Sequence, residues 1–144
     1  MLKDNFKDLN LWEYIADDVM GGVSDGNVKF QNVDGNNIAL LQGNVSTENN
    51  GGFIQIRRAL RNVDLDKAKS VKIVAKGNNQ EYFVFLRTTG TVLPWQYYSS
   101  KFKVSEKFEE FILPIDEFKK SGLLMTSKVN SKNITSIGLV AFGR

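Results

Sequence analysis

The chain has 144 residues, of which 42% are hydrophobic and 24% charged, and its formal net charge is +3 at pH 7. These values predict one soluble globular domain with a real core. Cysteine and histidine are both absent, which excludes disulfides, thiolate nucleophiles, Ser-His-Asp triads and zinc sites built on either residue. The lysines are scattered rather than clustered, so we expect no nucleic-acid partner.

The chain shows no sign of targeting or of membrane insertion. No N-terminal segment combines a basic start, an apolar middle and a small-residue cleavage site, and no apolar run approaches the length of a membrane span. We therefore expect a cytoplasmic protein without direct membrane insertion. Neither a linker nor a repeat divides the sequence, which predicts a single domain over residues 1–144.

Short apolar runs alternate with turn residues about every ten residues, which is typical of a β-sandwich or barrel. Both faces of the run at residues 81–88 carry large apolar groups, so this run is expected to be a central strand. The expected strands, in chain order, are Leu11–Ile15, Val28–Asn32, Asn37–Leu41, Phe53–Leu60, Val71–Ala75, Glu81–Thr88, Tyr97–Lys103, Phe108–Leu113 and Ile134–Phe142.

Three further features complete the expected architecture. Lys76–Gln80 has the composition of a hairpin loop, because glycine and asparagine accept left-handed backbone angles. Pro114–Lys120, with Gly122 at its end, predicts a single helical turn. The last strand ends two residues before the chain does. It therefore closes a sheet, is covered by a partner's strand, or precedes a strand that the domain lacks.

Two segments with paired glycines are the most distinctive motifs. The first, residues 17–26, contains Asp17, Asp18, Ser24 and Asp25. Its carboxylates could bind calcium or a sugar, but we favour Asx-type turns in which aspartate side chains accept hydrogen bonds from loop N–H groups. The EF-hand pattern is absent, and no metal site is predicted.

The second diglycine segment spans residues 48–53. Glu48, Asn49 and Asn50 precede Gly51 and Gly52. Asparagine side chains both donate and accept hydrogen bonds, which suits recognition of a polyol. A tight turn or a bulge at the start of the following strand explains the same residues equally well.

Three arginines are candidates for charge recognition. Arg57 and Arg58 are adjacent on an expected strand, so they point to opposite faces, and the one that faces the core needs a partner. Arg57 or Arg87 could bind a carboxylate or phosphate in bidentate fashion. For Arg87 we favour a structural ion pair with an aspartate of the first diglycine segment.

Aromatic residues follow Pro94. Trp95 and Tyr97 could stack on a sugar ring or contact a protein partner. Tyr98 and Phe102 fall on one strand face, so we expect Tyr98 to be buried and Trp95 to be exposed.

Catalysis is not expected. A pair such as Asp17 and Glu48 is conceivable for glycoside hydrolysis. No nucleophile motif, phosphate-binding loop or dinucleotide fingerprint occurs, however. We predict that the chain is not an enzyme and binds no cofactor.

Together these motifs resemble the complex I intermediate-associated protein family. Trp12 followed by Asp18–Ser24 matches one signature of that family, and Glu48–Phe53 followed by Arg57 matches the other. The sequence departs from the family pattern at Asp17, where Asn is common. It also has Phe108 or Phe111 in place of a common Trp, and the family's closing strand is not found after Arg144. Weaker matches are Arg87, the step from Tyr98 to Phe102, and Leu113-Pro114-Ile115 with Phe118 and Gly122.

The resemblance implies a galactose-binding-like antiparallel jelly-roll β-sandwich with about eight to ten short strands and at most one or two helical turns. Mitochondrial members of this family act as assembly factors for respiratory complex I. The residues thus predicted to bind a ligand or partner are Asp18, Met20, Gly21, Gly22, Ser24, Glu48, Asn49, Asn50, Gly51, Gly52, Arg57, Arg87, Trp95 and Tyr97.

Three hypotheses follow. The first is a non-catalytic binding or assembly module for a protein partner, such as an assembly intermediate of a membrane enzyme. The second is a module that binds carbohydrate or another small polar ligand through Trp95, Tyr97, Asn49, Asn50 and Arg57. The third gives the glycine pairs a structural role, with the two diglycine segments converging and Asp18 holding Arg57.

Overall fold

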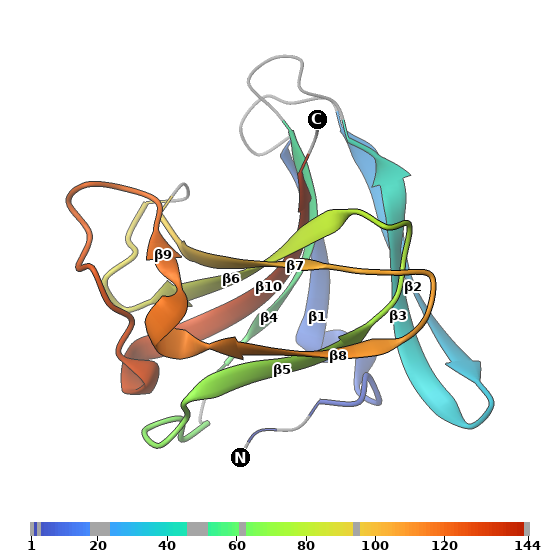
Figure 1. Ribbon diagram of the computed structural model, residues 1–144, viewed down its shortest axis with the longest axis horizontal. Helices are drawn as coiled ribbons and strands as arrows, with labels where there is room; N and C mark the ends of the chain where they lie inside the picture. Colours follow the sequence, from blue (N-terminus) through green and yellow to red (C-terminus); the bar gives the residue numbers. More distant parts are fainter. Residues whose placement is uncertain are drawn as a thin grey trace. The chain divides into compact units, whose positions relative to one another are not determined.

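The computed structural model describes residues 2, 4–17, 24–45, 52–60, 63–93 and 96–142. Strands dominate these residues, and the helical elements whose full bounds are described are single 3-10 turns at Leu9–Leu11, Ile115–Glu117 and Ser131–Asn133 (Figure 1). The strands are β1 (Trp12–Ala16), β2 (Asp25–Val33), β3 (Asn36–Asn44), β4 (Phe53–Ala59), β5 (Ser70–Ala75), β6 (Glu81–Thr88), β7 (Tyr98–Lys103), β8 (Glu109–Pro114), β9 (Lys119–Lys120) and β10 (Ile134–Phe142).

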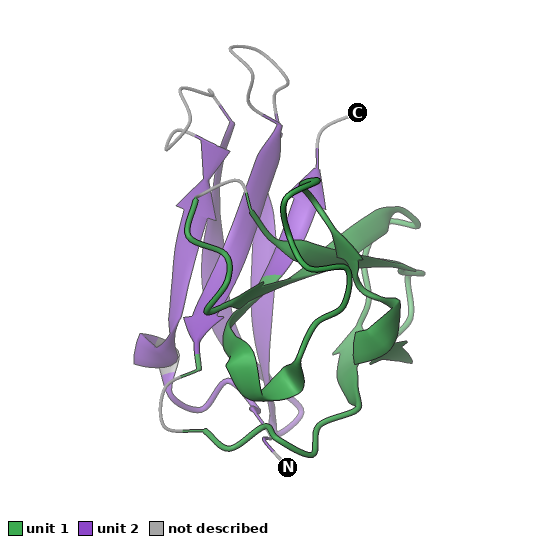
Figure 2. Cartoon of the chain, turned by 90° about the vertical axis from the view of Figure 1, so that its left-hand side faces the viewer, with its two compact units in different colours: residues 1, 60–138 green, residues 2–59, 139–144 purple. Residues whose placement is uncertain are grey.

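The strands form one large sheet and two small ones. The order in the large sheet is β1-β4-β10-β6-β7-β9, and the small sheets pair β2 with β3 and β5 with β8. By their internal contacts the residues divide into two compact units, residues 60–138 and residues 2–59 with 139–144 (Figure 2).

The unit of residues 60–138 has a core between two sheets. Val84 and Leu86 of β6 are almost completely buried. Phe102 of β7 lies 5.2 Å from Phe111 of β8, measured between ring centroids. This contact packs β7 against the β5-β8 sheet, as expected for apolar side chains that alternate along strands.

The unit of residues 2–59 and 139–144 contains a long hairpin and the β1-β4 pair. The β2-β3 hairpin turns at Asp34 and Gly35, whose φ angles of 53° and 82° fit a type I′ turn. In β1 and β4, Ala16 pairs with Ile54 and Tyr14 with Ile56, and both isoleucines are buried. This register places the end of β1 beside the start of β4.

Each predicted strand overlaps an observed one, and their ends differ by up to three residues. The central position of β6 is confirmed, because it lies between β10 and β7. The prediction of a hairpin at Lys76–Gln80 is wrong, because β5 pairs with β8 while β6 pairs with β7. That segment connects two sheets instead of two neighbours in one sheet.

Two other predictions concern the second half of the chain. The helical turn expected at Pro114–Lys120 is only a 3-10 turn at Ile115–Glu117, after which Lys119 and Lys120 form β9 beside β7. β10 lies between β4 and β6, which matches the sheet-closing alternative. In the described ranges, no helix is long and apolar enough to cross a membrane.

Candidate functional site

The side chain of Asp17, directly after β1, is fully buried and accepts four hydrogen bonds from described residues. Its Oδ1 accepts from the Ser24 backbone N–H at 3.0 Å. Its Oδ2 accepts from the Ser24 hydroxyl at 2.5 Å, from the Gly52 N–H at 2.5 Å and from the Phe53 N–H at 3.2 Å. We call Asp17, Ser24, Gly52 and Phe53 the Asp17 knot.

The register of β1 and β4 explains the Asp17 knot. Since Ala16 pairs with Ile54, Asp17 lies next to the first N–H groups of β4. Gly52 has a φ of 135°, which L-residues rarely adopt, so glycine is required there. The Asp17 knot thus joins the ends of the two diglycine segments, and their predicted convergence is confirmed.

The aspartate that connects the two diglycine segments is Asp17, and the described groups that donate to it are uncharged. The prediction that an aspartate accepts from backbone N–H groups is confirmed, but the expected local Asx-type turn is wrong for Asp17, because its donors lie 7, 35 and 36 residues away. The Asp18–Arg57 pair stays a prediction, because Asp18 lies outside the described residues. Arg57 is half-buried on β4, directly opposite Glu13 of β1.

Burial raises the pKa of Asp17. Hydrogen bonds from the Ser24 hydroxyl and from the N–H groups of Gly52, Ser24 and Phe53 outweigh this, and the net pKa lies below the ordinary 3.8. The carboxylate is therefore ionised at neutral pH. Its oxygens are engaged by protein donors, which disfavours Asp17 as a general base or calcium ligand. Asp25, by contrast, is exposed at the start of β2.

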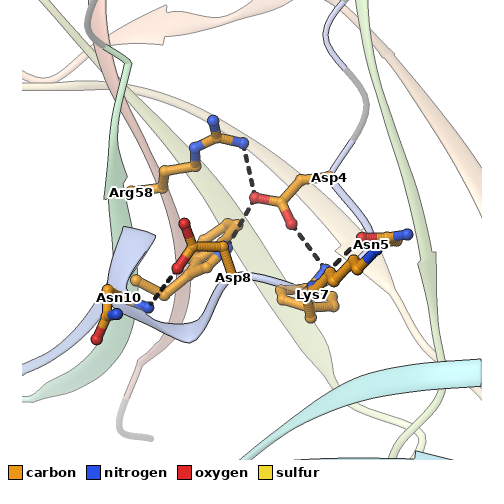
Figure 3. Close-up of polar contacts among 8 residues, drawn as sticks. Asp4, Asn5, Lys7, Asp8, Asn10 and Arg58 are labelled. Carbon is orange, nitrogen blue, oxygen red and sulfur yellow. Dashed lines mark hydrogen bonds and ion pairs between the residues drawn. The ribbon is translucent and has the colours of Figure 1, made fainter.

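A partly buried ion pair between Asp4 and Arg58 was not anticipated from the sequence. The Asp4 Oδ2 atom accepts from the Arg58 guanidinium at 2.7 Å and from the Trp12 indole N–H at 2.9 Å. Its Oδ1 accepts from the Phe6 backbone N–H at 2.7 Å. Figure 3 shows Asp4 facing Arg58, with the turns of Asn5 and Asp8 beside them. Arg58 is thus the inward arginine, and it has the partner that the sequence required. The sequence contains no local signal for this pair, because Asp4 and Arg58 lie 54 residues apart along the chain.

The other described candidates are engaged in local structure. Arg87 donates to the carbonyls of Thr91 at 3.2 Å and Leu93 at 2.9 Å. An ion pair with an aspartate was expected, but the hydrogen bonds described for Arg87 go to these backbone carbonyls. Tyr97 stacks on Phe85 with ring centroids 3.9 Å apart, and burial raises the pKa of Tyr97.

Tyr98 is buried, as predicted, with 3% exposure. Its hydroxyl donates to the Thr126 carbonyl at 2.9 Å. The remaining candidates lie outside the described residues: Asp18, Met20, Gly21, Gly22, Glu48, Asn49, Asn50, Gly51 and Trp95.

A polar hollow of about 470 Å³ lies on the β2-β3 hairpin next to the Asp17 knot. Gly26 and Gly43 pair across its strands, and a Cβ on either would clash with the opposite backbone. Only Asp25 had been singled out from the sequence, because alternating polar residues usually mark a solvent-facing strand. The lining residues are Asp25, Gly26, Asn27, Gln42, Gly43 and Asn44.

Comparisons with known proteins identify a family and a shared fold. The sequence model of the family described as Complex I intermediate-associated protein 30 matches residues 3–144. No curated protein matches the chain significantly.

Two solved structures share its fold. The Family 11 Carbohydrate-Binding Module of the cellulosomal cellulase Lic26A-Cel5E of Clostridium thermocellum is 16% identical, with a TM-score of 0.77 over 97% of this chain and 83% of that one. The Family 11 Carbohydrate-Binding Module from Clostridium thermocellum in complex with a beta-1,3-1,4-mixed-linked tetrasaccharide is 14% identical, with a TM-score of 0.79 over 98% of this chain and 85% of that one. The fold is therefore the predicted antiparallel jelly-roll β-sandwich.

Proposed function

Because the chain belongs to the Complex I intermediate-associated protein 30 family, we propose that it is a non-catalytic assembly module that binds a protein partner. The partner class that fits is an assembly intermediate of a membrane enzyme. The observation that carries the proposal is the Asp17 knot, which fixes the ends of both diglycine segments at one point.

The Asp17 knot supports binding rather than chemistry. A catalytic carboxylate needs a free oxygen near its substrate, whereas Asp17 is fully buried and accepts hydrogen bonds from Ser24, Gly52 and Phe53. Loops on a rigid scaffold are common binding surfaces, and fixing their ends beforehand lowers the entropy lost on association. We therefore place the partner surface on residues 18–23 and 46–51. A cytoplasmic location belongs to the same proposal.

Affinity purification from the native host, with the full chain as bait, tests this function. We expect a defined protein partner to be recovered. The double variant Asn49→Ala/Asn50→Ala should lose that partner at least tenfold, as expected when interface hot spots are removed. Gly52→Val is a poor test because its φ of 135° makes any side chain there disruptive.

The matched control is Asn36→Ala/Asn37→Ala. These adjacent asparagines are exposed at the other end of β3, next to the hairpin turn. Their removal should leave partner recovery unchanged. Equal recovery with both double variants would place the partner surface elsewhere.

Carbohydrate binding is the second candidate, and the polar hollow on the β2-β3 hairpin favours it. Amide and carboxylate side chains there offer both donors and acceptors, as recognition of hydroxyl groups requires. A structural neighbour was solved with a mixed-linked tetrasaccharide. Calorimetry against a glycan panel that includes this tetrasaccharide tests the idea. Binding should disappear in Asn27→Ala/Gln42→Ala, and a panel without any response would exclude it.

A further inference from the structure

The connection from β9 to the 3-10 turn at Ser131 presents two adjacent leucines to solvent. Leu123 is 92% exposed and Leu124 is 99% exposed. Single exposed leucines are ordinary on protein surfaces, but two neighbours without any cover form a continuous apolar tip. We call Leu123 and Leu124 the leucine tip.

Hydrogen bonds hold both ends of the leucine tip. The Ser121 N–H donates to the Tyr97 carbonyl at 2.9 Å, and the Tyr97 N–H donates to the Ser121 hydroxyl at 3.0 Å. The Lys120 ammonium donates to the carbonyls of Leu123 and Met125, each at 3.4 Å.

Burial of the next residue fixes the far end. Met125 is only 8% exposed, and its N–H donates to the Gly122 carbonyl at 3.4 Å. The carbonyl of the following residue, Thr126, accepts a hydrogen bond from the Tyr98 hydroxyl. The leucine tip is therefore the outer part of an anchored turn, and its exposure is not that of a loose chain end.

The part of the chain that follows Glu117 and contains the leucine tip carries charges of one sign. No acidic residue follows Glu117, whereas Lys119, Lys120, Lys128, Lys132 and Arg144 do. The chain has 19 basic and 16 acidic residues, so residues 1–117 keep 14 basic and 16 acidic residues, a net charge of −2. The positive balance of the chain thus lies entirely in residues 118–144.

We propose that residues 119–128 are a peripheral membrane-docking loop for an anionic lipid surface. Leu123 and Leu124 enter the interfacial layer, and the flanking Lys119 and Lys128 contact lipid phosphates or carboxylates. Stable peripheral binding combines an apolar anchor with basic residues, and this turn supplies both. A lipid surface can accept apolar side chains without a complementary pocket, and the leucine tip, which is exposed on every side, fits such a surface. The inference goes beyond the proposed function and does not depend on it.

Vesicle co-sedimentation of the full chain tests the proposal. The wild-type chain should bind phosphatidylcholine vesicles containing about a third phosphatidylserine, and bind pure phosphatidylcholine much more weakly. Leu123→Ser/Leu124→Ser should weaken binding to anionic vesicles by at least about tenfold. Lys119→Gln/Lys128→Gln should weaken it by about fivefold per lysine at low salt.

The matched control is Val74→Ser/Ile112→Ser on β5 and β8, where the side chains are 60% and 57% exposed. It removes two other exposed apolar side chains of the same unit and should bind vesicles as the wild type does. Because Leu123 and Leu124 are so exposed, their variant should melt at the wild-type temperature, which separates lost docking from lost folding.

Three results would overturn the proposal. The first is that the wild-type chain binds anionic and neutral vesicles equally well, and the second is that it binds neither. The third is that Leu123→Ser/Leu124→Ser binds anionic vesicles as strongly as the wild type does. If that variant kept vesicle binding but lost a protein partner in affinity purification, the leucine tip would dock into a protein. The Asn49→Ala/Asn50→Ala result is independent of all three.

Discussion

Two aspartates of the same unit, Asp17 fully buried and Asp4 partly buried, show different uses of a carboxylate. Among the described residues, Asp17 accepts hydrogen bonds only from neutral donors, and these bonds connect three chain segments. Asp4 lies opposite the Arg58 guanidinium and also binds the Trp12 indole. Asp17 chiefly satisfies backbone groups, whereas Asp4 chiefly compensates a charge. Removal of the first leaves N–H groups unpaired, and removal of the second leaves an arginine without its counter-charge.

The largest effect should come from Asp17→Asn. The amide keeps one acceptor oxygen but turns an NH₂ group toward N–H donors of the Asp17 knot, so at least one buried N–H loses its partner. We expect the free energy of unfolding to fall by about 3–5 kcal/mol, measured by urea denaturation. Asp25→Asn, at the exposed start of β2, should change it by less than about 0.5 kcal/mol. Similar losses in both would show that the Asp17 knot does not stabilise the fold.

The difference in stability between the wild type and Asp17→Asn should depend on pH. Because the folded-state pKa of Asp17 lies below its ordinary 3.8, its stabilisation is complete above pH 3.8 and is lost as pH falls through the folded pKa. The stability gap between wild type and Asp17→Asn should therefore be constant near neutral pH and narrow below pH 3.8. A gap that widened on acidification would contradict the assigned direction of the shift. Unfolding followed by circular dichroism between pH 2 and 7 measures it.

Arg58→Met should have the next largest effect, about 2 kcal/mol, because the side chains of Arg58 and Asp4 are only 11% and 17% exposed. Asp4→Asn/Arg58→Met should lose less stability than the sum of the two single variants, by about 1 kcal/mol. Unfolding of all four proteins gives this coupling. Additive losses would mean that the charge pair contributes nothing of its own.

Ser24→Ala should cost about 1 kcal/mol, because it removes the hydroxyl donor of the Asp17 knot and leaves the Ser24 backbone N–H in place. Ser127→Ala, in an exposed part of the connection after β9, provides the control. A loss as large as that of Asp17→Asn would mean that the hydroxyl, rather than the backbone N–H groups, dominates the knot.

The smallest effect should come from the surface pair Glu81 and Lys101, whose side chains are 50% and 68% exposed at a separation of 3.5 Å. Glu81→Gln should change the free energy of unfolding by less than about 0.5 kcal/mol, since exposed ion pairs are screened by solvent. Thermal melting at low and high salt checks this. A change comparable to that of Arg58→Met would remove the distinction between buried and exposed pairs.

The strands could be predicted because their signals are local. The alternating side chains of Val71–Ala75 and the two apolar faces of Glu81–Thr88 follow directly from the period of a strand. Which strands pair with one another could not be predicted in the same way. Lys76–Gln80 has the composition of a hairpin turn, yet it connects different sheets, because the partner of each strand is chosen by contacts distant in sequence.

The candidate site was predicted in part. An aspartate that satisfies loop N–H groups was expected from its short side chain beside glycines, and Asp17 does so. The expected local Asx-type turn was wrong for Asp17, because its donors lie 7, 35 and 36 residues along the chain. Asp4 with Arg58 and the polar hollow at Asn27 and Gln42 were missed. Neither has a sequence motif. Asp4 and Arg58 lie 54 residues apart along the chain, and Asn27 meets Gln42 only through the register of β2 and β3.

The sequence by itself determined the fold class, the strand positions and the family, because side-chain alternation, turn residues and two diglycine motifs are written along the chain. Only the tertiary structure decided which carboxylate joins the diglycine segments, which arginine pairs with Asp4 and which leucines remain in solvent. Burial and hydrogen-bond partners are properties of a folded neighbourhood, and identical residue types at adjacent positions, such as Arg57 and Arg58, differ only through the face that each presents.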